Sequence, residues 1–293
     1  MANLNYKTFK DRYPDEPPAG LNHNYIKPGD SMLDIGGASG SLLDFINKDI
    51  PISGAVLDTD VDCLEYGSKK YPNIKYQQGE FPSFLPDEKY DIVSMQALFP
   101  HLLDWKASIL GMSKIAKKYI NFSALVRVNG TTIADPDISY FYYLDTGRRT
   151  PQVLNNIFEI INFLSIEEVR AKKIQFWGGG TVRFPEIPQD MIESMEKHKN
   201  TTRDYTLSYG EGGHAFRCDY GFRIYQGNFM VELFSEEDNP KRMGGLGSHY
   251  EKDFPEYSFF RPEVLIDIND RQFFYQRNGE TTINATIVWG GVL

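Results

Sequence analysis

The feature that most constrains the fold of this chain is a short glycine-rich turn at residues 36–40. Residues 32–35, just before it, form an apolar run typical of a buried strand, and apolar side chains follow it at helical spacing: Leu42, Leu43, Phe45 and Ile46. The turn therefore lies at a strand-to-helix crossing. There the backbone bends sharply, and the free N–H groups of the first helical turn face a ligand. This predicts an α/β protein with a ligand at the crossing.

The spacing of the turn separates two classes of nucleotide ligand. Dinucleotide-binding turns carry G-x-G-x-x-G, whereas this chain has Asp34-x-Gly36-x-Ala38-x-Gly40. A carboxylate at the end of the strand suits a ligand with an ammonium group. The pattern resembles motif I of the class I S-adenosylmethionine-dependent methyltransferases, D/E-x-G-x-G-x-G, with Ala38 in place of the middle glycine.

The resemblance implies that S-adenosylmethionine is the cofactor and S-adenosylhomocysteine the product. Asp34 would hold the methionine ammonium, directly or through water. The backbone of the turn would run beneath the methionine portion, at Gly36, Gly37, Ala38, Ser39 and Gly40. An ordinary tight turn in another α/β protein fits the same residues, because short glycine patterns recur by chance.

A second acid supports the resemblance. Asp58 ends the apolar run at residues 52–58, 18 residues beyond Gly40, which is close to the length of a βαβ unit. A carboxylate there can accept both ribose hydroxyls, and Thr59 follows where the adenine edge would pass. The alternative is that an acid caps the helix predicted at residues 61–70, a role that Asp60 fits better than Asp58.

Two further strands end in residues that match the family. Residues 74–77 lead to Gly79, Glu80 and Phe81, where the family has an acid for the adenine amino group and an apolar residue that packs on the ring or gives its N–H. Residues 90–95 resemble the fourth strand of these enzymes and end at Gln96. Ligands of open α/β sheets bind beyond the carboxyl ends of the strands, so Gln96 joins the predicted cofactor site.

The chain continues with βα spacing. Helical spacing relates Trp105, Ile109, Met112 and Ala116, residues 119–126 predict a fifth strand, a helix is predicted to start at Thr150 and Pro151, and residues 173–177 predict another strand. The expected fold is α/β, with a Rossmann-like, doubly wound, mostly parallel sheet. Residues 1–200 form the predicted methyltransferase domain. Residues 201–293 form a β-rich accessory region, one strand of which is alternatively the antiparallel last strand of the main sheet.

Composition excludes several partners. The net charge is −9 without a dense Lys/Arg block, which argues against nucleic acid. No apolar run approaches the length of a membrane span, and the polar start lacks a signal peptide core, so a cytoplasmic protein is expected. The two cysteines form no disulfide framework, and the histidines near them match no ligand spacing, so no metal is expected.

The residues expected to act on the substrate follow the fourth strand. His101 is the predicted general base, and Asp104 either orients it, acts itself or caps the next helix. The family's amino-methylating motif N/D-P-P-Y/F/W is absent. Four residues are predicted to bind the substrate, although the arginines equally fit a solvated surface: Tyr142, Tyr143, Arg148 and Arg149.

The resulting hypothesis is a methyltransferase acting on a small molecule, most plausibly a hydroxyl of a sugar, a nucleotide sugar or another carbohydrate-pathway metabolite. The alternatives are an N-methyltransferase acting on a small amine, a cofactor-binding protein without catalysis, and a nicotinamide-dependent oxidoreductase. The sequence predicts no oligomeric state.

Overall fold

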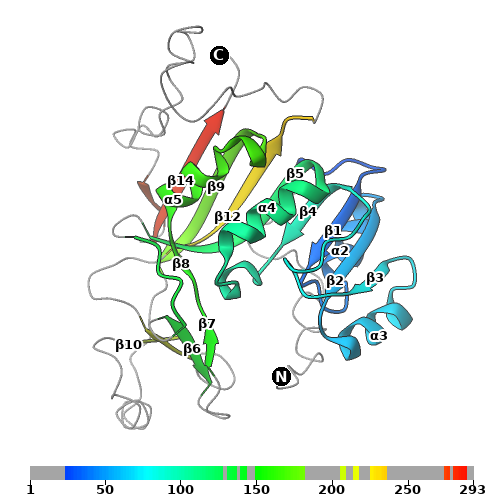
Figure 1. Cartoon of the computed structure of the whole chain (residues 1–293), viewed down its shortest axis with the longest axis horizontal. Helices are drawn as coiled ribbons and strands as arrows, with labels where there is room; N and C mark the ends of the chain where they lie inside the picture. Colours follow the sequence, from blue (N-terminus) through cyan, green and yellow to red (C-terminus); the bar gives the residue numbers. More distant parts are fainter. Residues whose placement is uncertain are drawn as a thin grey trace, which may run out of the picture.

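The computed structural model describes residues 24–127, 131–136, 139–143, 149–181, 205–208, 214–217, 225–235, 274–277 and 280–288. The first half alternates strands and helices: β1 (Ser31–Ile35), α2 (Ser41–Asp49), β2 (Ser53–Asp58), α3 (Val61–Lys70), β3 (Lys75–Gln78), β4 (Tyr90–Met95), α4 (Trp105–Ile115) and β5 (Ala116–Arg127). Its five strands are parallel and lie in the order β3-β2-β1-β4-β5 (Figure 1).

The second half extends the same sheet beyond β5. Its elements are β8 (Leu154–Asn156), α5 (Ile157–Leu164), β9 (Ala171–Thr181), β12 (Tyr225–Leu233), β13 (Phe274–Arg277) and β14 (Glu280–Val288). Strand β12 is antiparallel to both β5 and β9, and β14 and β13 follow outside β9. Short β8 pairs with the end of β5. The expected α/β fold, Rossmann-like and doubly wound, is therefore present.

A smaller antiparallel sheet lies beside the main one. Its strands are β6 (Tyr140–Tyr143), β7 (Arg149–Pro151), β10 (Tyr205–Ser208) and β11 (His214–Arg217), in the order β10-β11-β6-β7. Residues on both sides of position 200 thus contribute to both sheets. A C-terminal segment, β12, does supply an antiparallel strand of the main sheet, but it lies between β5 and β9 and is not the last strand that the alternative named. The domain boundary at residue 200 stays a prediction.

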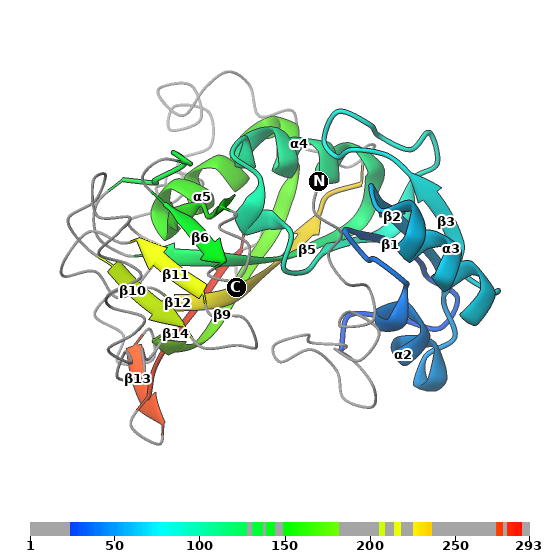
Figure 2. The ribbon, with the colours of Figure 1, turned by 90° about the horizontal axis from the view of Figure 1, so that it is seen from below.

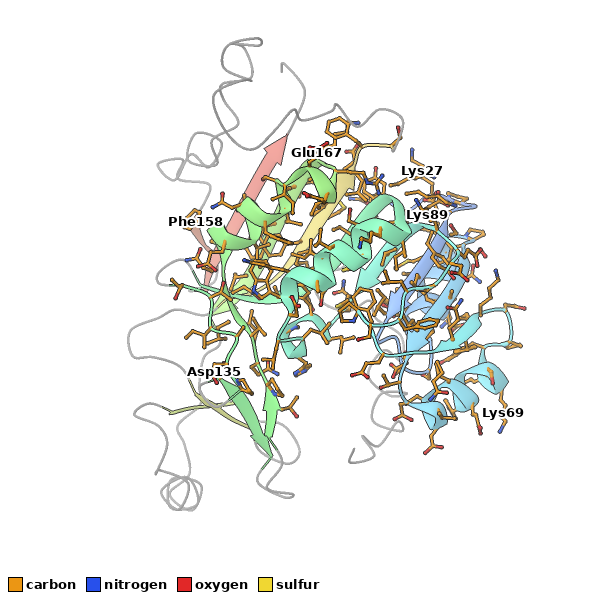
Figure 3. All side chains as sticks on the ribbon, in the orientation of Figure 1. Lys27, Lys69, Lys89, Asp135, Phe158 and Glu167 are labelled. Carbon is orange, nitrogen blue, oxygen red and sulfur yellow. The ribbon has the colours of Figure 1, made fainter. Side chains whose placement is uncertain are left out.

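Two hydrophobic cores cover the main sheet. Side chains of α4 and α5 fill one face, and those of α2 and α3 pack on the other (Figures 2 and 3). At the amino ends of the strands, Lys118 of β5 pairs with Asp30 at 2.8 Å and with Asp91 at 3.1 Å, while the Ser31 hydroxyl donates to Asp91 at 2.8 Å. This network ties β1, β4 and β5 together at that edge.

Two predictions are wrong in the described residues. Ala116, expected on the helix from Trp105, is the first residue of β5, and no helix starts at Thr150 and Pro151. Pro151 ends β7, an edge strand of the small sheet, where a residue without an N–H is tolerated. The helix α5 begins six residues later at Ile157. Its N-cap is Asn156, whose side chain accepts from the N–H of Phe158 at 2.8 Å.

Candidate functional site

The main sheet has a topological switch point between β1 and β4. The chain runs from β1 outward to β2 and β3, then returns to β4 on the opposite side of β1 (Figure 1). Open α/β sheets bind ligands in the crevice at the carboxyl ends of such neighbouring strands. The glycine turn follows β1 and Gln96 follows β4, so both lie at this crevice.

The turn adopts the left-handed backbone that its glycines allow. Gly36 has φ 72° and Gly40 has φ 81°. Ala38, which stands where the family has a glycine, is also left-handed with φ 47°. Such a conformation costs an L-residue about 1–2 kcal/mol. A hydrogen bond from the Ala38 N–H to Asp58 Oδ2, at 2.9 Å, helps to hold it.

Two of the glycines are required by close approach. A Cβ on Gly36 would lie 2.8 Å from Cδ2 of Leu98, which follows β4. A Cβ on Gly37 would lie 2.8 Å from Oδ2 of Asp34 and 3.0 Å from its carbonyl oxygen. The turn is therefore packed directly between the end of β1 and the loop after β4.

Asp34 is the most unusual group of the site. Its side chain is 3% exposed, and its Oδ1 is buried without a hydrogen-bond partner among the residues that the structure describes. Burial, followed by the nearby charge of Asp58, raises the pKa of Asp34 to about 7, while a hydrogen bond from Ser94 lowers it. A buried oxygen without a partner is costly and calls for a donor or cation from a ligand.

Asp58 joins β2 to the turn and remains open to a ligand. Its Oδ2 accepts from Ala38 N–H, its Oδ1 accepts from Asp60 N–H at 2.9 Å, and the residue is half-buried. Each carboxylate oxygen has a second lone pair for another donor. Asp60 caps α3 through the N–H groups of Asp62 and Cys63, as predicted.

The loop after β3 supplies less than expected. Glu80 is exposed, and the Gly79 N–H binds the last carbonyl of β2 at 3.0 Å. The ring of Phe81 is 5% exposed and packs under α4, where a Cβ on Gly111 would approach it to 2.8 Å. The ring is therefore part of the core and is not available to pack on an adenine. Of the two predicted contacts of Phe81 with the adenine, only the one through its backbone N–H is left. Thr59 is exposed beside this loop.

Beyond β4, Gln96 belongs to a polar network that the sequence analysis missed. Its Nε2 donates to Asn121 Oδ1 of β5 and lies 3.4 Å from Ser94 Oγ. The next residue, Ala97, has φ 62° and donates its N–H to Ser123 Oγ at 2.7 Å. In the sequence this network is marked only by polar residues within apolar strands, namely Ser94 in β4 and Asn121 and Ser123 in β5.

His101 is anchored to the segment between β7 and β8. It ends the short helix η1 (Phe99–His101), and its Nδ1 lies 2.9 Å from the Pro151 carbonyl and 2.7 Å from Gln152 Nε2. The Pro151 carbonyl requires a proton on Nδ1, whereas an amide nitrogen beside Nδ1 requires a lone pair there. The carbonyl can only accept, but the Gln152 amide can exchange its nitrogen and oxygen by a 180° flip, so we assign the proton to Nδ1. The neutral ring then keeps its basic lone pair on Nε2.

Asp104 has a structural role in the described residues. It is exposed and caps α4, with Oδ1 accepting from the Ala107 N–H at 2.9 Å. Among the described residues, Pro151 and Gln152 contact the His101 ring. The capping alternative is thus confirmed, and a direct catalytic role for Asp104 stays a prediction.

The four predicted substrate residues are only partly described. Tyr142 and Tyr143 lie in β6, and Arg149 of β7 pairs with Tyr142 in the register. Arg148 lies outside the described residues. The same β7 strand ends at Pro151, which contacts His101, so the structure joins this segment to the predicted base.

The rest of the described chain offers no metal site and no membrane span. No group of three or more His, Cys, Asp or Glu side chains there could hold a metal ion. None of the helices described is long and apolar enough to cross a bilayer. A cavity of about 220 Å³ lies at the amino ends of the strands, beside Asp30 and Lys118, and therefore away from the glycine turn.

Comparison with known proteins gives one relative in sequence. No protein-family profile matches the chain. Over 119 residues it is 27% identical to 235L of Invertebrate iridescent virus 6, which is named as a methyltransferase. That stretch covers 39% of this chain and 44% of the viral protein, so the chain spans less than half of its relative's length.

Several solved structures are similar. YcgJ of Bacillus subtilis aligns with a TM-score of 0.46 and 14% identity, over 72% of this chain and 94% of its own. Coclaurine N-methyltransferase, bound to N-methylheliamine and S-adenosylhomocysteine, aligns with a TM-score of 0.46 and 11% identity, over 71% of this chain and 68% of its own. Phosphoethanolamine N-methyltransferase 2 of Haemonchus contortus, with S-adenosylmethionine, aligns with a TM-score of 0.45 and 14% identity, over 73% of this chain and 50% of its own. These values are too low to support a conclusion, and the fold rests on the strand order.

Proposed function

We propose that this chain is an S-adenosylmethionine-dependent methyltransferase acting on a small molecule. The observation that carries the proposal is the buried, unpaired Oδ1 of Asp34 at the switch point, next to a turn in which Gly36 and Gly37 leave no room for a side chain. An ammonium group satisfies this oxygen and neutralises the charge. The half-buried Asp58 at the end of the adjacent strand offers two further acceptors.

The described residues fit the cofactor in three places. Asp34 would bind the ammonium, the backbone of residues 36–40 would lie under the methionine portion, and Asp58 would accept from the ribose hydroxyls. The exposed Glu80 stands where it would meet the adenine amino group. When bound, S-adenosylmethionine supplies an electrophilic methyl group on its sulfonium.

For the acceptor we propose a hydroxyl of a sugar or a related carbohydrate metabolite. The acidic composition of the chain supports this choice, as do the aromatic and basic residues of β6 and β7, since the last residue of β7, Pro151, contacts His101. With the cofactor bound, the acceptor oxygen would take the methyl group and the sulfonium sulfur would keep the electrons of the broken carbon–sulfur bond. The role of His101 would be to accept the hydroxyl proton at Nε2.

Calorimetric titration with S-adenosylmethionine and S-adenosylhomocysteine tests the cofactor. We expect binding by the wild-type protein and by Asp60→Ala, which removes only a helix cap, but none by Asp34→Ala or Asp58→Ala. A folded wild-type protein that binds neither compound, or prefers NADH, refutes the proposal. Binding without transfer to sugar or amine acceptors favours a protein without catalysis, and transfer to an amine alone corrects the acceptor.

A further inference from the structure

A row of buried polar side chains crosses the main sheet on the face that carries Asp34. Asp34 pairs with Ser94, Ser94 with Asn121, and Ser123 with Asn228 of β12. Directly paired residues of neighbouring strands share a face, so these side chains lie on one side of the sheet. Ser94 and Asn121 have no exposed surface, and the other three are at most 7% exposed. Buried polar groups are costly unless they are paired or used.

Hydrogen bonds to Asn121 determine whether the nitrogen or the oxygen of the Gln96 amide faces the crevice. The carbonyl of Phe229 can only accept, so its 3.0 Å bond to Asn121 identifies Nδ2 as the donor. Asn121 Oδ1 must then accept from Gln96 Nε2, which also faces Ser94 Oγ. The oxygen of the Gln96 amide is therefore the end turned away from the sheet. It is available to a hydrogen-bond donor.

Asn228 offers a second acceptor further along the row. Its side chain is 7% exposed, yet Oδ1 is enclosed without a hydrogen-bond partner. Buried amide oxygens are nearly always paired, so this one calls for a donor that the described part of the chain does not supply. The strand order puts β12 three strand spacings from β1, or about 14 Å from Asp34 across the sheet.

We propose that this row is the floor of the acceptor site. In this reading Gln96 Oε1 and Asn228 Oδ1 accept hydrogen bonds from the molecule to be methylated, which must present hydroxyl or amine donors toward the sheet. Asn121 is a positioning residue that acts through Gln96. The proposal rests on the proposed function, because Asp34 must hold the ammonium for the acceptor to lie beyond Gln96.

The positioning step is tested by NMR of the Gln96 side-chain amide in protein saturated with S-adenosylhomocysteine. Both of its protons face acceptors, so we expect slow exchange with solvent in the wild type. Asn121→Ala should accelerate exchange at least tenfold, and Asn121→Asp, which keeps an accepting oxygen as a buried neutral carboxyl, should retain most of the protection. Equal exchange in the wild type and Asn121→Ala overturns the role of Asn121.

The acceptor contacts are tested by titrating the same complex with three probes. Methyl α-D-glucopyranoside offers hydroxyls, ethanolamine offers an amine, and permethylated methyl glucoside offers no donor. We expect at least one donor-bearing probe to shift the Gln96 and Asn228 side-chain signals, and the permethylated sugar to shift neither. A shift with the glucopyranoside indicates a hydroxyl acceptor, and a shift with ethanolamine indicates an amine acceptor.

Asn228→Leu should lower the affinity for the probe that binds about tenfold, which is the contribution of one hydrogen bond. It should not lower the unfolding temperature of the free protein. The matched control is Asn155→Leu. Asn155 is also buried and has no hydrogen-bond partner for its amide among the described residues, but it lies opposite Val126 in the strand pair and so faces the other side of the sheet. If S-adenosylhomocysteine binds and no donor-bearing probe shifts these signals, the acceptor floor is wrong. If S-adenosylhomocysteine itself fails to bind, the proposed function is wrong as well.

Discussion

Replacing Asp34 by asparagine should stabilise the free protein. The pKa of Asp34 is about 7 in the folded chain against an ordinary 3.8, because burial and Asp58 disfavour its charge. Since the folded pKa is the higher one, ionisation weakens folding. The penalty is absent below about pH 4, grows between pH 4 and 7 and is constant above. A difference of about three pKa units corresponds to an upper estimate of about 4 kcal/mol.

Urea unfolding of wild type and Asp34→Asn at pH 8 and pH 4, without ligand, measures this penalty. We expect the variant to be more stable by a few kcal/mol at pH 8 and by little at pH 4. With excess S-adenosylhomocysteine the order should reverse, because only the wild type gains binding energy.

Asp30→Asn is the matched control. Asp30 is 5% exposed and therefore also buried, but its carboxylate pairs with Lys118 at 2.8 Å and accepts from the Lys27 N–H. The same substitution there should destabilise the protein, by about 1–3 kcal/mol. If Asp34→Asn is equally or less stable than the wild type at pH 8, the charge of Asp34 is compensated in the free protein, and the argument for a cationic ligand fails.

Three further results are expected. The affinity for S-adenosylhomocysteine, measured by calorimetry from pH 5 to 8, should fall below about pH 7 as Asp34 becomes protonated; a flat profile contradicts its role. Gly37→Ala places a Cβ 2.8 Å from Asp34 Oδ2, so it should abolish S-adenosylhomocysteine binding and lower the free energy of thermal unfolding by about 1–3 kcal/mol. Normal binding by this variant would show that the turn has room for a side chain. Ala38→Gly should relieve the positive φ and stabilise the protein by up to about 1 kcal/mol in urea unfolding, and an unchanged stability would show that the Ala38 backbone carries no strain.

The elements that the sequence predicted well depend on local signals. The bounds of α3 and β4 were predicted to the residue, because Asp60 caps one and the apolar run of the other is bounded by turn residues. The predicted helix start at Pro151 was wrong for the converse reason. A proline suits the first turn of a helix and an edge strand alike, and the pairing of β7 with β6 decides between them.

The candidate site divides in the same way. Asp34 and the glycine turn are contiguous, so their spacing alone marks the cofactor side. Asn121 and Asn228 lie far apart in the sequence and share a face only because β12 inserts antiparallel between β5 and β9 in one register. A shift of that register by one residue would turn Asn228 to the opposite face. The proposed acceptor side therefore combines Gln96 and Asn121 of the first half with Asn228 of the C-terminal part, and the glycine turn alone does not predict the acceptor.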